Sequence, residues 1–248
     1  MDAIFGKMVF MKNIVSVIIS THNEMKLDFL RKSLENLHDI PGVELIIVDR
    51  KSDDGTSELA SRYADKMIST TQNSRAKRLN MGIEIASGEI IFLHHPRSII
   101  DTNALRWLIE NKTEVTWGGL THQFDEDHFA LKFTSWYSNM VRGRIREILY
   151  LDHCIFFRRN LIHEHDAVPE VDVFEDTLLS QKLKAKGKME LLPFVSKTSA
   201  IRFTHRGVFT QALVNQLMKI GFYLNLSDKW MNRLYEGTLK LNSKYKKV

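Results

Sequence analysis

With 248 residues, the chain is long enough for one large α/β domain or two small ones. Its 44% hydrophobic and 26% charged residues are ordinary for a globular protein, and a net charge of +5 without a basic arm points away from nucleic acid as a partner. The single cysteine, Cys154, excludes an intrachain disulfide and fits a reducing compartment. We expect no signal peptide at residues 1–11, and no run reaches the ~20 apolar residues of a membrane span.

Strand-like and helix-like segments alternate over roughly the first hundred residues, after a loose extension at 1–12. The predicted strands are 14–20, 43–49, 66–69 and 89–93, and the predicted helices are 24–37, one that begins at Thr56, and 74–86. This alternation is typical of a parallel sheet whose strands are joined by right-handed crossover helices.

The pattern is less regular in the second half of the chain. The predicted strands are 113–117, 155–158 and 189–192, and the predicted helices are 133–141, 175–185 and 207–226. Apolar spacing puts Leu213, Leu217, Ile220 and Leu224 on one face of the last helix, and the segment 243–248 is basic. Because no repeat or low-complexity linker interrupts the chain, we predict one continuous domain.

Polar turns follow two of the predicted strands. Asp49 ends the second strand, and the turn at 52–56 contains Asp53 and Asp54 before it starts a helix. A carboxylate at a strand end can accept hydrogen bonds from a base or a ribose, and the backbone N–H groups of such turns can bind anions. The alternative is local: Asp53, Asp54 and Thr56 could simply cap the helix.

Further short motifs continue this series along the chain. They are Ser20-Thr21-His22-Asn23-Glu24, Ile46-Ile47-Val48-Asp49, Asn80-Met81-Gly82, the segment 86–94, Trp117-Gly118, the segment 152–159, Glu175-Asp176, and the segment 199–207. In this order, over about residues 15–222, they resemble the family 2 glycosyltransferases with the GT-A fold. The second half is similar to one bacterial subgroup with a Leu-His-Ala-Asp type motif in place of Asp-x-Asp.

This resemblance implies an α/β fold of the GT-A, nucleotide-diphospho-sugar transferase type, with a central, mostly parallel sheet flanked by helices. It divides the single domain, 1–248, into a nucleotide-binding half at 13–100, an acceptor half at 101–206, and a C-terminal amphipathic helix and basic tail at 207–248. The implied activity is transfer of a sugar, of the hexosyltransferase type and with inversion, from a nucleotide-sugar donor to an unknown acceptor. The implied setting is bacterial cell-envelope or polysaccharide biosynthesis, with no organic cofactor.

The resemblance also implies which residues bind the donor. They are Thr21, Asn23, Glu24, Asp49, Asp54, Arg75, Asn80, His95, Arg97 and Arg202. Asp49 and Asp54 would hold the base and the ribose, while the arginines would contact the diphosphate, because guanidinium groups bind phosphate in a bidentate way. For Asn23 the alternative is a helix cap, and for Arg202 it is a surface basic cluster with His205 and Arg206.

The same resemblance makes Asp176 the general base, next to Glu175. Inverting transfer needs a base that removes the proton of the acceptor hydroxyl as its oxygen attacks the anomeric carbon. The alternative is a capping pair, since carboxylates are favoured at a helix N-terminus even without a catalytic role. Asp152 and Trp117 would contact the acceptor, while Cys154 is a small packing residue.

The chain departs from the family pattern at His94-His95-Pro96-Arg97. The family places an Asp-x-Asp motif here, whose second Asp binds a divalent metal on the donor diphosphate, and this chain has Pro96 at that position. Three alternatives follow. His94 and His95, with His95 as the main candidate and with help from elsewhere, hold Mn²⁺ or Mg²⁺; Arg97 replaces the metal; or donor chemistry is lost. His94 and His95 point to opposite faces if the strand continues through them, so a paired-histidine site is awkward.

Two other functions therefore compete with sugar transfer. One is a catalytically degenerate GT-A-fold protein that only binds its ligand, and the other is a nucleotidyltransferase, which needs acidic metal ligands that the sequence does not supply in order. The expected location is cytoplasmic. The segment 207–248 also permits peripheral contact with the inner face of a membrane, because an apolar stripe and a lysine-rich tail suit an anionic bilayer.

Overall fold

The computed structural model describes residues 13–163 and 167–236. It contains an eight-stranded sheet with the order β3-β2-β1-β4-β7-β6-β8-β5. The strands are β1 (Val15–Thr21), β2 (Val43–Asp49), β3 (Lys66–Ser69), β4 (Ile90–His94), β5 (Ser98–Ile100), β6 (Trp117–Phe124), β7 (Ile155–Arg158) and β8 (Met189–Thr198). The β3-β2-β1-β4 half is parallel, as is the β6–β8 pair, while β7 pairs antiparallel with β4 and β6. The predicted α/β fold with a mostly parallel sheet is confirmed.

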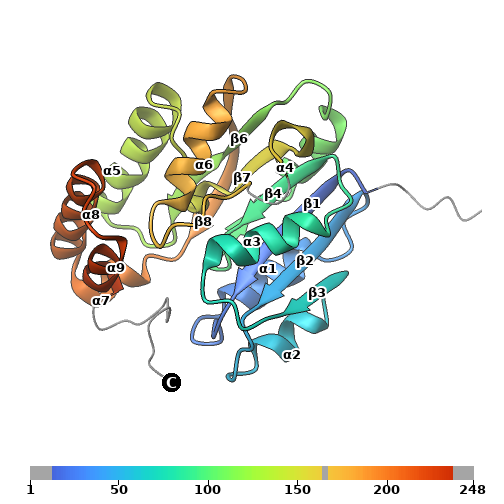
Figure 1. Ribbon diagram of the computed structural model, residues 1–248, viewed down its shortest axis with the longest axis horizontal. Helices are drawn as coiled ribbons and strands as arrows, with labels where there is room; N and C mark the ends of the chain where they lie inside the picture. Colours follow the sequence, from blue (N-terminus) through green and yellow to red (C-terminus); the bar gives the residue numbers. More distant parts are fainter. Residues whose placement is uncertain (1–12, 164–166, 237–248) are drawn as a thin grey trace, which may run out of the picture.

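Helices cover both faces of the sheet, and further helices lie beyond its second half (Figure 1). The helices are α1 (Phe29–Leu37), α2 (Thr56–Ser61), α3 (Arg75–Glu84), α4 (Asn103–Glu110), α5 (Phe129–Tyr137), α6 (Glu175–Lys184), α7 (Ile201–Arg206), α8 (Val208–Tyr223) and α9 (Asp228–Glu236). A π-helix, η1 (Ser138–Ile145), continues directly from α5. None of the described helices combines the length and the apolar content that a bilayer crossing requires.

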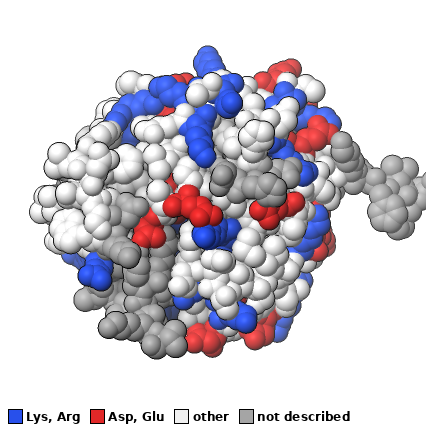
Figure 2. Space-filling view, in the orientation of Figure 1, with Lys and Arg blue, Asp and Glu red and all other residues white. Residues whose placement is uncertain are grey.

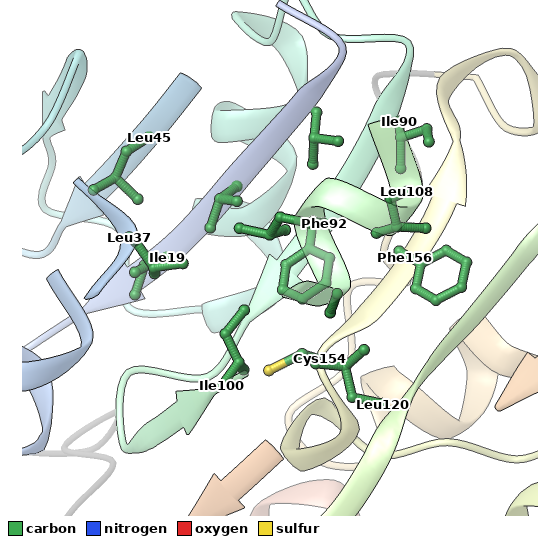
Figure 3. Packing of buried hydrophobic residues seen from close by; sticks show 14 of the residues in the cluster. Ile19, Leu37, Leu45, Ile90, Phe92, Ile100, Leu108, Leu120, Cys154 and Phe156 are labelled. Carbon is green, nitrogen blue, oxygen red and sulfur yellow. The ribbon is translucent and has the colours of Figure 1, made fainter. Parts of the chain in front are cut away.

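Alternation along the strands produces two hydrophobic layers. On one face of the sheet, Phe92 and Ile19 pack with α1 and α4, and Cys154 lies in the same layer, as Figure 3 shows. On the other face, Ile18 and Ile91 pack with α3 and α6. The sheet is thus buried on both sides, which explains why its strands read as continuous apolar runs.

Several predicted elements are displaced in the second half. The strand predicted at 113–117 is wrong, since β6 begins at Trp117, and the helix predicted at 133–141 begins earlier, at Phe129. β8 continues past the predicted end at 192 because Pro193 falls in a β-bulge, where Leu120 pairs with Leu192 but Thr121 pairs with Val195. The first helix begins only at Phe29, and β5 and α4 were not predicted.

At the edge of the sheet opposite the polar turns, the buried side chain of Glu44 accepts hydrogen bonds. Its carboxylate accepts hydrogen bonds from Ser16 Oγ at 2.5 Å and from the N–H of Ser87 at 2.5 Å, and it pairs with Lys66 Nζ at 2.8 Å. Burial would raise the pKa of Glu44, but hydrogen bonds from Lys66, Ser16 and Ser87 outweigh it and lower that pKa to about 2. These contacts join β1, β2, β3 and the start of β4.

We expect Glu44→Gln to lower the free energy of unfolding at pH 7. Since the folded-state pKa is depressed, the contribution of the carboxylate is complete above its ordinary pKa, near 4.5, and disappears as the pH falls toward about 2. Urea unfolding of both proteins between pH 7 and 2 should therefore show a difference that vanishes in acid. A difference that stays constant with pH would contradict this role, and Glu35→Gln, on the exposed side of α1, is the matched control.

Candidate active site

The carboxyl ends of β1 and β2 carry two polar turns that are hydrogen-bonded to each other through Asp49. This side chain is fully buried, and its Oδ1 accepts from Thr21 Oγ1 at 2.8 Å and from Ser52 Oγ at 2.7 Å. Its Oδ2 accepts from the N–H of Ser52 at 2.8 Å and from Ser57 Oγ at 2.5 Å. Four hydrogen bonds occupy the carboxylate, so in this structure Asp49 holds the turn in shape.

Asn23 and Asp54 connect the same turns at their outer side. Asn23, at a φ of 52°, donates from Nδ2 to Asp53 Oδ1 at 2.8 Å and accepts from the N–H of Asp53 at 3.2 Å. Asp54 accepts from the N–H of Met25 at 3.0 Å and from Thr56 Oγ1 at 2.6 Å. Burial would raise the pKa of Asp54, but these hydrogen bonds lower it. Both residues therefore hold the two turns together on their outer side.

A buried ion pair joins the turn after β1 to the loop after β4. Arg97 Nε donates to Glu24 Oε2 at 2.8 Å and Nη2 donates to Oε1 at 3.0 Å, with the two side chains only 8% and 7% exposed. Burial raises the pKa of Glu24, and the charge of Arg97 opposes that shift. The bidentate geometry fixes the guanidinium at the edge of the cavity described next.

A cavity of about 300 Å³ lies between the loop after β4, the start of α6, and helices α5 and α8. Half of the predicted site residues line it: Arg75, His95, Arg97, Asp152, Glu175, Asp176 and Arg202. Much of the remaining wall is aromatic and comes from Phe124, Phe133, Tyr137, Tyr150, Phe174, Phe203 and Tyr235. The cavity therefore combines cations, carboxylates and rings, which is a composition that suits a sugar and its phosphates.

Arg75 and the Glu175-Asp176 pair form the charged floor of the cavity. Arg75 Nε donates to Glu175 Oε1 at 2.6 Å, and the N–H of Leu151 donates to Asp176 Oδ2 at 3.1 Å. Burial and the neighbouring charge of Glu175 raise the pKa of Asp176 to about 6, against the opposing charge of Arg75. A carboxylate with a pKa in this range can accept a proton near neutral pH.

The two histidines after β4 diverge. His94 ends the strand, is fully buried, and has its Nε2 3.4 Å from Ser33 Oγ of α1, whereas the side chain of His95 lines the cavity. His95 Nε2 lies 3.9 Å from Asp152 Oδ1, and its Nδ1 accepts from the N–H of Arg97 at 3.2 Å. Burial lowers the pKa of His95 to about 3, so the imidazole is neutral at physiological pH.

These residues do not fit a divalent metal of the kind the fold family uses. Mg²⁺ and Mn²⁺ favour several oxygen ligands, and within the described residues no three His, Cys, Asp or Glu side chains converge to hold an ion. Pro96 offers no ligand, and His95 and Asp152 have the cations of Arg75 and Arg97 beside them.

Two of the predicted residues lie neither on the cavity wall nor in the polar turns after β1 and β2. Trp117 is fully buried in the layer under α6, where its Nε1 donates to the carbonyl of Gly187 at 2.8 Å. Asn80 donates to the carbonyl of Val168 and accepts from its N–H, both at 2.9 Å. Both side chains therefore position backbone in the structure, Trp117 at the start of β6 and Asn80 in the segment before α6.

Arg202, at the other end of the cavity, stacks on Tyr235. Its guanidinium carbon is 4.3 Å from the ring centroid, and Nη1 donates to the Tyr235 carbonyl at 3.4 Å. This contact between α7 and α9 holds a cation on the wall opposite α6.

Sequence reasoning missed several polar residues of the wall. His122 of β6 is 4% exposed, and neither ring nitrogen has a partner within the described residues. Arg142 stacks on Tyr150, 3.3 Å from the ring centroid, and Lys219 of α8 lies 5.5 Å from the centroid of the Tyr137 ring. No local motif marks these side chains. Only a predicted strand that continued from Trp117 through residue 124 would have placed His122 in the sheet.

The strand order, the polar turns at the strand ends and the adjacent charged cavity define a glycosyltransferase of the GT-A fold class. The chain belongs to glycosyl transferase family 2, whose model matches residues 16–165. Comparison of the sequence with curated proteins gives no match.

Solved structures support the fold at low sequence identity. Residues 1–349 of TarS from S. aureus, in complex with UDP-GlcNAc, match with a TM-score of 0.61 at 16% identity, over 94% of this chain and 73% of that one. The mannosyltransferase PcManGT from Pyrobaculum calidifontis, in complex with GDP-Man and Mn²⁺, matches with a TM-score of 0.58 at 19% identity, over 97% and 77%. Mannosyl-3-phosphoglycerate synthase from Rubrobacter xylanophilus matches with a TM-score of 0.52 at 13% identity, over 86% and 75%.

We expect Arg97→Met to destabilise the protein by about 3–5 kcal/mol, because it leaves the buried carboxylate of Glu24 without its partner. The double variant Glu24→Gln with Arg97→Met should recover part of this loss, since no buried charge remains. Urea unfolding at pH 7 measures both values. A single variant within about 1 kcal/mol of the wild type would show that the pair contributes nothing to folding.

Proposed function

We propose that the protein transfers a sugar from a nucleotide-sugar donor to a hydroxyl group of an acceptor, with inversion at the anomeric carbon. The observation that carries this proposal is Asp176, a half-buried carboxylate on the cavity wall whose pKa is raised to about 6 by desolvation and by the charge of Glu175. Membership in the family supplies the reaction class. The complexes of TarS with UDP-GlcNAc and of PcManGT with GDP-Man support a nucleotide-sugar as the donor class.

The donor nucleotide would occupy the crevice at the carboxyl ends of β1 and β2. Thr21 and Asp49 are buried and bonded to each other, so their part is to fix the turn backbone around the base. Asn23 and Asp54 lie at the outer rim, where polar atoms can meet the ribose. Ligands of open α/β sheets bind in such a crevice outside the carboxyl ends of the strands.

The donor diphosphate would lie against arginines instead of a metal. Arg75 and Arg97 are held in place by Glu175 and Glu24, and both line the cavity next to the strand ends. Fixed cations can stabilise the charge that develops on a leaving diphosphate, as a metal ion does in other sites. The PcManGT complex contains Mn²⁺, whereas this chain has Pro96 after His95 and the cations of Arg75 and Arg97 on its cavity wall.

The reaction would then proceed as a single displacement. The acceptor hydroxyl gives its proton to a carboxylate oxygen of Asp176 as the acceptor oxygen bonds to the anomeric carbon. The bond between that carbon and the diphosphate oxygen breaks, and the nucleoside diphosphate leaves with the electron pair, close to Arg75, Arg97 and Arg202. Asp152, beside His95, would orient the acceptor or the donor sugar by accepting hydrogen bonds from hydroxyl groups.

We expect a nucleoside diphosphate or nucleotide-sugar to stabilise the protein in the presence of EDTA. A ligand at ~100 times its dissociation constant adds about 2.7 kcal/mol of stability, which a thermal shift detects readily. The panel should contain uridine and guanosine diphosphates and their sugar conjugates, each with EDTA, Mg²⁺ or Mn²⁺. A shift that appears only with Mn²⁺ would contradict the arginine assignment, and no shift with any member would favour a degenerate binding protein.

We expect Asp176→Asn to lower the rate of sugar transfer by about 10²- to 10⁴-fold while the donor-induced thermal shift persists. In the wild type, kcat/KM should fall as the pH drops through about 6, because the base becomes protonated. Release of nucleoside diphosphate with a membrane or cell extract as acceptor source measures the rate. Glu170→Gln is the matched control, since Glu170 pairs with Lys77 outside the cavity; equal rates for Asp176→Asn and this control would contradict the proposed base.

A further inference from the structure

Helix α8 carries its apolar stripe on the outside of the protein. Phe209, Leu213, Leu217, Ile220 and Leu224 follow helical spacing, and their exposed fractions are 75, 61, 44, 53 and 66%. The side chains that α8 buries are instead Gln211, Met218 and Gly221. An amphipathic helix normally buries its apolar stripe against the core, so this orientation leaves a face that needs a partner.

The neighbouring helix α5 has the same orientation. Phe129, Phe133 and Trp136 are 72, 62 and 54% exposed, whereas Leu131 and Ser135 are buried. The rings of Phe133 and Trp136 stack with centroids 5.7 Å apart. Helices α5 and α8 thus both direct large apolar side chains away from the core.

These helices form one continuous surface, which we call the apolar face. Lys219 of α8 reaches over the Tyr137 ring of α5, and Arg146, after η1, donates to the hydroxyl of Tyr223. Within the described residues, Met25 and Ile85 are the only exposed large hydrophobic side chains outside α5, η1, α8, α9 and their adjoining loops. Figure 2 shows this side of the molecule, at the left, as mostly white.

The charged side chains of α5, η1 and α8 are all cationic. The segments α5, η1 and α8 contain no Asp or Glu, and they contain Lys132, Arg142, Arg144 and Lys219. Lys132 pairs with Asp127 just before α5, while Arg144 is exposed. A second copy of this chain, packed across a two-fold axis, would bring these positive charges together. A lipid surface with negative headgroups would instead complement them.

The cavity of the candidate active site reaches the same helices. Its wall includes Phe133 and Tyr137 of α5 and Ala212, Gln216 and Lys219 of α8. An acceptor molecule that enters the cavity between these helices would therefore approach from the side of the protein on which the apolar face lies.

From these observations we propose that the apolar face binds the surface of an anionic lipid bilayer, so that the cavity opens toward the membrane and receives an amphipathic, lipid-borne acceptor. Aromatic side chains such as Trp136 and Tyr223 suit the headgroup level, and Arg144 suits anionic lipid phosphates. The acceptor class rests on the proposed sugar transfer, while the membrane contact stands on the exposed side chains alone.

Flotation with lipid vesicles tests the contact without any donor or acceptor, so it can fail or succeed independently of sugar transfer. The full chain is mixed with vesicles of phosphatidylcholine alone or with 30% phosphatidylglycerol, in low and high salt. We expect binding to the anionic vesicles that weakens with salt. Leu213→Glu and Phe209→Glu should each lower the vesicle partition coefficient about tenfold or more, because each removes an apolar side chain from the membrane contact. Arg144→Glu changes the charge by two and should lower the coefficient by about 25-fold, at roughly fivefold per charge.

Ile85→Glu is the matched control, because it adds the same charge at an exposed apolar position outside the apolar face. Thermal unfolding verifies that every variant is folded. No flotation of the wild type, or equal flotation of Leu213→Glu and Ile85→Glu, overturns the proposal. A wild-type dimer that Leu213→Glu dissociates, together with absent flotation, overturns it in favour of a second copy as the partner.

Discussion

The ion pair between Arg75 and Glu175 is the interaction on which the candidate site depends. It joins α3 of the first half of the chain to α6 of the second half, across 100 residues of sequence, with 2.6 Å between Arg75 Nε and Glu175 Oε1. The pair places the Arg75 cation beside Asp176 and keeps the Glu175 carboxylate next to it. That carboxylate and burial together raise the pKa of Asp176. The proposed diphosphate site and the proposed proton acceptor would therefore be coupled through one contact, because Arg75 lies beside both.

The parallel half of the fold could be predicted because its signals are local. β1 and β2 are short apolar runs that end in polar turns, and such runs need no knowledge of distant residues. The second half depends on non-local pairing: β8 passes through Pro193 by a bulge opposite β6, and β5 is a three-residue strand that exists only through β8. Neither feature leaves a periodic pattern in its own segment.

The candidate site shows the same limit at the level of single residues. Motif resemblance identified Asp176 and Arg97, which do line the cavity, but it could not say that Asp49 has four hydrogen bonds within the protein. The spacing of apolar residues identified the stripe of α8, but it does not say whether that stripe faces the core or the solvent. Only the tertiary structure shows Leu213 exposed and Gln211 buried, and this reversal motivates the membrane proposal.

The most direct test of the central claim is the titration of Asp176 itself. The side-chain carboxyl ¹³C resonance of Asp176, assigned with the Asp176→Asn variant, can be followed from pH 3 to pH 9 in the wild type and in Glu175→Gln. The account predicts a pKa near 6 in the wild type and a lower pKa in Glu175→Gln, because the neighbouring negative charge is gone. A wild-type pKa at or below the ordinary value of an aspartate, unchanged by Glu175→Gln, would contradict the assignment of Asp176 as a base set by its surroundings.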